Sequence, residues 1–152
     1  MNKMDIRGVL IPIGGNEDKG VDKPEHSTLE FIDDGILARV VRESGGTDAM
    51  IVVVPTASSI PDEVGKNYLD AFGKLGCTNV KLMDIRKRED SELEENITLA
   101  KQANCFMFSG GDQSQITHKI GNTSIHRILQ ERYKKEPVVI AGTSAGAMCM
   151  SK

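Results

Sequence analysis

The pentapeptide GTSAG at residues 142–146 is the stretch of this sequence whose residue types and spacing could do chemistry. It fits the pattern GxSxG, in which a serine on a tight strand-to-helix turn presents its hydroxyl as a nucleophile. Small neighbours are needed on both sides, because larger side chains would collide with the backbone where the strand folds back into the helix. The alternative is a glycine-rich connection whose serine caps a helix. The pentapeptide alone leaves both interpretations open.

The flanking residues favour the turn. An apolar run at residues 138–141 leads into Gly142, and a small-residue segment that can start a helix leaves from Ala145. This succession predicts that Ser144 lies between a buried strand and a helix.

Four more apolar runs precede this one, and segments of helical periodicity separate them. The expected strands cover residues 9–13, 50–54, 80–85, 105–108 and 138–141. The expected helices cover residues 29–44, 64–75, 93–100, 116–120 and 124–135. Because the strands are continuous apolar runs, they predict an α/β fold with a doubly wound, mostly parallel sheet covered on both faces, flavodoxin-like in general type.

Several details carry expectations of their own. Pro12 cannot donate to a sheet ladder, so we expect it near the end of its strand or on a bulge. The charge run at residues 86–90 is expected to be a solvated loop. We expect Leu93, Ile97 and Ala100 on one face of their helix, and Arg132, Lys134 and Lys135 on an exposed basic face.

Composition limits the function classes. A chain of 152 residues with 39% hydrophobic content predicts one domain spanning 1–152. The net charge is −3 with Lys and Arg spread along the chain, so no nucleic-acid partner is expected. No apolar stretch approaches the ~20 residues of a membrane helix, which predicts no membrane association and a cytoplasmic protein.

No cofactor or metal is expected either. The histidines show no ligand spacing such as HExxH. The three cysteines, Cys77, Cys105 and Cys149, are widely spaced among apolar residues, and we interpret them as buried packing residues.

The loops after the strands are expected to meet at one edge of the sheet, because ligands of such sheets bind outside the carboxyl ends of the strands. At this edge, the rim, the N–H groups of Ala145 and of the Gly110–Gly111 turn could stabilise an oxyanion, and Gln113 and Asp112 could bind a substrate. The alternatives are a simple tight turn for the glycines and a helix cap for Asp112.

Four motifs, in this order and at these separations, resemble the cyanophycinase and dipeptidase E family of serine peptidases. They are GGNEDK at 14–19, VVPTASS at 53–59, FSGGDQ at 108–113 and AGTSAGA at 141–147. The resemblance runs over essentially the whole chain, and the GGDQ form is closer to the cyanophycinase branch.

The resemblance implies a fold similar to class I glutamine amidotransferases and a hydrolase that cleaves peptides at aspartyl residues. Cyanophycinases act on β-aspartyl-arginine linkages in cyanophycin. By the motif match, Ser144 would be the nucleophile, Ala145 and Gly110–Gly111 would form the oxyanion hole, and Gln113 would contact the substrate.

The sequence departs from the family after the serine. Family members continue well beyond it and take their catalytic histidine and acidic partner from that part, whereas only residues 145–152 follow Ser144 here. His26, His118 and His126 precede Ser144, and we expect each to be an ordinary surface residue. The resemblance therefore predicts a domain that is incomplete at its C-terminal end, truncated after the nucleophile elbow.

Such a fragment is expected to be inactive beyond a residual catalysis of about 10³-fold over water. Its shortened last helix would leave an apolar edge exposed, which predicts poor solubility or a homodimer.

Two alternatives remain open. One is an aspartyl or isoaspartyl dipeptidase of the same family. The other is a non-catalytic α/β module that binds a small anion at glycine-lined helix N-termini. Amidotransferase activity is disfavoured, because the elbow holds a serine and Cys149 lies inside the following helix.

Overall fold

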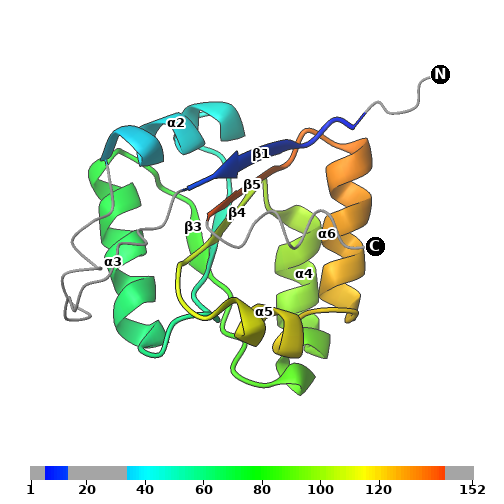
Figure 1. The fold of residues 1–152 in the computed structure, drawn as a ribbon. Helices are drawn as coiled ribbons and strands as arrows, with labels where there is room; N and C mark the ends of the chain where they lie inside the picture. Colours follow the sequence, from blue (N-terminus) through cyan, green and yellow to red (C-terminus); the bar gives the residue numbers. More distant parts are fainter. Residues whose placement is uncertain (1–5, 14–33, 143–152) are drawn as a thin grey trace.

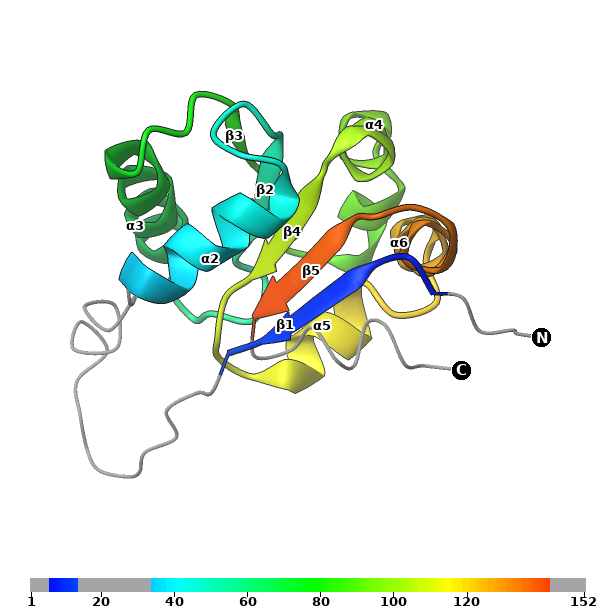
Figure 2. The ribbon, with the colours of Figure 1, turned by 90° about the horizontal axis from the view of Figure 1, so that it is seen from above.

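A five-stranded sheet lies at the centre of the computed structural model, which describes residues 6–13 and 34–142. Its strands are β1 (Val9–Pro12), β2 (Ile51–Val54), β3 (Val80–Leu82), β4 (Cys105–Phe108) and β5 (Val139–Gly142). They are ordered β1-β5-β4-β2-β3, and every neighbouring pair is parallel (Figure 2). The predicted parallel α/β sheet is confirmed, and Pro12 ends an edge strand, as its missing N–H requires.

Helices cover both faces of this sheet (Figure 1). One face carries α2 (Asp34–Ser44) and α3 (Pro61–Lys74). The other carries α4 (Glu94–Gln102), α5 (Gln113–Lys119) and α6 (Ser124–Lys135), against which the short 3-10 helix η1 (Arg88–Glu92) packs.

The strands bury alternate side chains on opposite faces, which is why they consist of continuous apolar runs. In β4, Phe106 and Phe108 pack under α4, α5 and α6, whereas Cys105 and Met107 face α2 and α3. All four side chains are at most 1% exposed. Two separate hydrophobic clusters therefore stabilise the two halves of the sandwich.

The strand order brings the loops with distinctive motifs together. The chain crosses from β1 to β2 and β3 under α2 and α3, then returns through α4, α5 and α6 to place β5 between β1 and β4. The carboxyl ends of β1, β5, β4 and β2 are thus adjacent. Only β3, whose following segment carries no such motif, lies at the far edge.

Two expectations about charged side chains hold only in part. Residues 86–89 are exposed, as expected of a solvated segment, but the short helix η1 begins at Arg88, whose side chain donates to the His118 carbonyl. On the predicted basic face, Lys134 and Lys135 are exposed, but the Arg132 side chain is only 12% exposed, and its Nη1 donates to the Ala100 carbonyl at 2.8 Å. A helix face that is basic in sequence can still be covered by a neighbouring helix.

Two expectations about burial fail. Leu93 is 45% exposed, because it is the N-cap of α4 and precedes the face that packs inward. His126 is not a surface residue: it is 5% exposed, and its Nδ1 accepts a hydrogen bond of 2.9 Å from the Asn122 N–H.

Candidate functional site

The loop between β4 and α5, residues 109–112, lies against the turn that follows β2. The Ser109 N–H donates to the Val54 carbonyl at 3.2 Å, and the Asp112 N–H donates to the Ala57 carbonyl at 2.9 Å. Gly111 has φ +138°, and a Cβ there would lie 2.2 Å from the Ala57 oxygen. Only glycine fits a backbone that passes so close to another strand end.

Two backbone donors of this loop are available to a ligand. Within residues 6–13 and 34–142, neither the Gly110 nor the Gly111 N–H donates to a protein acceptor, and both residues are exposed. Unpaired N–H groups on a rigid backbone are the groups that an oxyanion hole requires. The predicted pair of glycines therefore has the free donors that its proposed role needs.

The Asp112 carboxylate, by contrast, already accepts hydrogen bonds within the protein. Asp112 is the N-cap of α5, and its Oδ1 accepts from the Ser114 N–H at 3.0 Å and from the Ser114 hydroxyl at 2.7 Å. The Ser114 hydroxyl, followed by the Ser114 N–H, lowers the pKa of the Asp112 carboxyl. Gln113, the first residue of α5, is exposed beside it.

The end of β5 is pressed against the end of β4. Gly142 is paired with Phe108 and has φ +120°, and a Cβ there would lie 2.0 Å from the Phe108 carbonyl oxygen. The chain therefore leaves β5 directly beside the start of the Gly110–Gly111 loop. The neighbouring positions of β4 and β5 in the sheet thus bring the ends of these two motifs together.

The predicted nucleophile lies outside the described residues. Ser144 follows Gly142 by two positions, and neither it nor Ala145 is described. The same holds for His26 and for the motif at 14–19. Of the predicted site residues, the structure places Gly110, Gly111, Asp112 and Gln113 on one loop and helix start at the rim.

The turn after β2 is fixed by a residue that the sequence analysis did not single out. Thr56 is 5% exposed and donates its hydroxyl to the Ile85 carbonyl at 3.1 Å. This bond ties the turn to the segment after β3. A threonine inside a PTASS turn gives no local sign of such a distant acceptor.

The described ranges contain no group of three or more His, Cys, Asp or Glu side chains that could hold a metal ion. Within the same ranges, no helix is both long and apolar enough to cross a bilayer. Cys77 and Cys105 are buried free thiols, as predicted, and burial raises the pKa of Cys105 to about 12. Cys149 lies outside the described residues.

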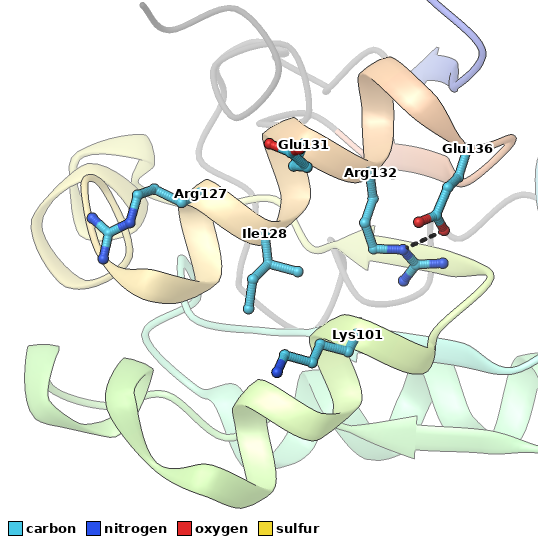
Figure 3. Close-up of a pocket in the computed structure, with 6 residues that line it drawn as sticks. All are labelled: Lys101, Arg127, Ile128, Glu131, Arg132 and Glu136. Atoms are coloured by element: carbon cyan, nitrogen blue, oxygen red, sulfur yellow. Dashed lines mark hydrogen bonds and ion pairs between the residues drawn. The ribbon is translucent and has the colours of Figure 1, made fainter.

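A groove of about 480 Å³ lies elsewhere, between α4 and α6 (Figure 3). Its lining residues are Lys101, Arg127, Ile128, Glu131, Arg132 and Glu136. Lys101 and Arg132 are in the last turns of helices that lead into β4 and β5, so this α4–α6 groove is at the amino ends of the strands. It is therefore separate from the rim.

The charges of the α4–α6 groove largely neutralise one another. Arg132 Nε pairs with Glu136 at 2.8 Å (Figure 3), and Glu131 pairs with Lys135 at 2.8 Å. Arg127 donates to the Asn122 carbonyl and the Ser124 hydroxyl. These contacts give the groove a structural role.

The fold defines a class of protein, the doubly wound α/β proteins, whose ligands generally bind outside the carboxyl ends of the strands. Comparison with known proteins identifies the family. The model of Peptidase family S51 matches residues 23–152, and the chain belongs to this family of peptidases. The predicted family is thereby confirmed.

The relatives agree with this assignment. The chain is 31% identical over 148 residues to a cyanophycinase of Geminocystis herdmanii (strain PCC 6308), an alignment that covers 97% of this chain and 50% of the relative. It is 30% identical over 146 residues to a cyanophycinase of Synechococcus elongatus, covering 96% and 42% respectively. The chain thus spans about half the length of the curated relatives it matches.

A solved structure supports the fold. The crystal structure of a peptidase from an acI-B1 Actinobacterium superposes with a TM-score of 0.67 at 23% identity, covering 94% of this chain and 56% of the other.

Proposed function

We propose that this protein is a cyanophycinase-like serine peptidase that hydrolyses β-aspartyl-arginine linkages, with Ser144 as the nucleophile. One observation carries the proposal: the chain leaves β5 at Gly142 directly beside a loop whose two glycine N–H groups have no acceptor among the described residues. Ser144 follows two positions later, so a carbonyl under attack by its hydroxyl would have these donors within reach.

In the proposed reaction, Ser144 Oγ attacks the carbonyl carbon of the linkage and gives up its proton to a base. The N–H groups of Gly110, Gly111 and Ala145 would stabilise the oxyanion of the tetrahedral intermediate. Gln113 is exposed at the start of α5, and its side-chain amide would form a hydrogen bond with a polar group of the substrate. Collapse of the intermediate releases the amine and leaves an acyl-enzyme, which water then hydrolyses.

The base is a group outside the described residues. His126 is buried, and its Nδ1 is engaged by the Asn122 N–H. His118 lies in the last turn of α5, away from the Gly110–Gly111 loop at the start of that helix. A chain that lacks this base would show only the residual hydrolysis that an oxyanion hole and binding provide.

An anion-binding module is less consistent with the rim. α5 begins at the Asp112 carboxylate, and α3 has Asp62 and Glu63 in its first turn. Negative side chains at a helix N-terminus complement the helix dipole and repel a second anion. These two helix starts do not favour phosphate or sulfate.

The substitution Ser144→Ala tests the proposal. Hydrolysis of a β-aspartyl-arginine dipeptide is measured for the variant and for the wild-type protein. We expect kcat/KM to fall by at least about 10³-fold, because the covalent step is lost. Ser44→Ala is the matched control, since that serine lies at the end of α2, where it contacts the Val40 carbonyl and the Cys105 thiol and no residue of the candidate site. Undiminished hydrolysis by the Ser144 variant would exclude it as the nucleophile. Faster cleavage of α-aspartyl dipeptides would instead favour the dipeptidase alternative.

A further inference from the structure

The segment around η1 holds the C-terminal end of α5. Arg88 Nη1 donates to the His118 carbonyl at 2.8 Å, and Arg88 Nη2 donates to the Gly121 carbonyl at 2.8 Å. Carbonyls in the last turn of a helix lack partners within the helix. From thirty or more residues away in the sequence, one guanidinium therefore satisfies the last-turn carbonyl of His118 and the carbonyl of Gly121 just beyond the helix.

Two further side chains of η1 strengthen this contact. Ser91 is fully buried and donates its hydroxyl to the Lys119 carbonyl at 2.7 Å. Glu92 accepts from the Ser124 hydroxyl at 2.6 Å and from the Ser124 N–H at 3.1 Å, at the start of α6. The short helix η1, which precedes β4 in the sequence, thus fixes the junction between α5 and α6, which follow β4.

The opposite end of α5 carries the candidate site. This helix has only seven residues, too few to be stable without tertiary contacts. Its first residue is Gln113. The Gly110–Gly111 loop leads into it at Asp112, whose N–H donates to the Ala57 carbonyl. The position of the loop therefore depends on contacts at both ends of α5.

We propose that Arg88 is a positioning residue, which holds α5 so that the free Gly110 and Gly111 N–H groups and Gln113 keep one orientation at the rim. Arg88 acts through the backbone of α5, since its guanidinium donates to the far end of that helix. The catalytic consequence rests on the function proposed above, whereas the structural consequence does not.

Hydrogen–deuterium exchange tests the structural part. In Arg88→Gln we expect the amides of residues 112–120 to exchange at least about fivefold faster, because one end of α5 is released, while those of 51–54 and 105–108 keep wild-type rates. Arg132→Gln is the matched control: it also loses a 2.8 Å bond from an arginine to a carbonyl, but at the α4–α6 groove. It should leave residues 112–120 unchanged.

The inference fails if residues 112–120 of Arg88→Gln exchange at the wild-type rate, or if the sheet amides accelerate by the same factor. Ser91→Ala provides a milder variant should Arg88→Gln not fold. It removes only the bond to the Lys119 carbonyl, so we expect a smaller acceleration confined to the same residues. An acceleration elsewhere would contradict the inference as well.

Steady-state kinetics tests the catalytic part. Misplaced oxyanion donors should lower kcat about tenfold with little change in KM, and Arg88→Lys, which can reach one carbonyl, should recover part of the loss. Wild-type kcat in Arg88→Gln would reject the catalytic role even if exchange is faster. If Ser144→Ala leaves hydrolysis intact, the proposed function fails, and the exchange experiment still decides whether Arg88 positions α5.

Discussion

The two ends of the sheet differ in whether their polar groups are paired. At the carboxyl ends, Gly111 and Gly142 allow a close approach of neighbouring backbones, and the N–H groups of Gly110 and Gly111 have no acceptor among the described residues. At the amino ends, the α4–α6 groove has more charge, yet Arg132, Glu136 and Glu131 are paired. A groove lined by charges can thus be structural, whereas free donors on a constrained backbone are suited to bind a developing charge.

The largest effect should come from Gly142→Ala at the rim. Its Cβ would lie 2.0 Å from the Phe108 oxygen at a φ of +120°, so we expect a loss of at least about 3 kcal/mol in the free energy of unfolding. Urea denaturation measures it. Gly73→Ala is the control, because nothing lies within 4 Å of its Cβ in α3, and it should be neutral or stabilising. Equal effects of the two would mean that the rim backbone is not constrained.

Arg132→Ala should have the next largest effect, at the other end of the sheet. It removes a bond of 2.8 Å to the Ala100 carbonyl and a contact with Glu136, so we expect a loss of about 2 kcal/mol, measured by the same denaturation. Hydrolysis should persist once the protein is folded. Lys66→Ala, which breaks an exposed pair with Asp70, is the control and should change little. Loss of activity in folded Arg132→Ala would place catalysis at the groove.

A smaller effect concerns the pH dependence of the cap at the rim. Because hydrogen bonds from Ser114 lower the pKa of Asp112, the ionised cap contributes stability that is fully present above the ordinary Asp pKa. That contribution is lost as the pH falls through the lowered value. The difference in Tm between wild type and Asp112→Asn, which keeps a neutral acceptor, should shrink on acidification. A difference that grows at low pH would contradict this assignment.

The smallest effect is expected for Lys101→Ala. Lys101 is exposed at the α4–α6 groove and has no partner among residues 6–13 and 34–142. Its removal should change the free energy of unfolding by less than about 0.5 kcal/mol and leave kcat/KM unaltered. A clear rise in KM would show that the groove takes part in substrate binding.

Much of the fold was predictable because its signals are local. The strand β4 was expected at residues 105–108 and lies there, since four consecutive apolar residues between polar ones can only be buried on both faces. The start of α6 at Ser124 was equally well placed by its helical periodicity. The glycines of the rim were found because a turn that requires glycine displays it in the sequence.

The candidate site was predictable only in part. The motifs named Gly110, Gly111 and Gln113, but Arg88 and Thr56 were missed, because their partners are backbone carbonyls about thirty residues away. Every residue has a backbone carbonyl, so the residue types do not show which one accepts the bond. For the same reason, Arg132 and His126 were expected to be exposed and are covered.

By itself, the sequence determined the class of fold, the parallel strands and the family, because apolar runs, helical periodicity and glycine-rich motifs are local patterns. Three features became visible in the folded chain alone: β5 lies between β1 and β4, Gly142 lies against Phe108, and η1 holds α5. The physical reason is that strand order and carbonyl partners depend on which distant segments pack together. That choice is made by the whole core and by no single stretch of residues.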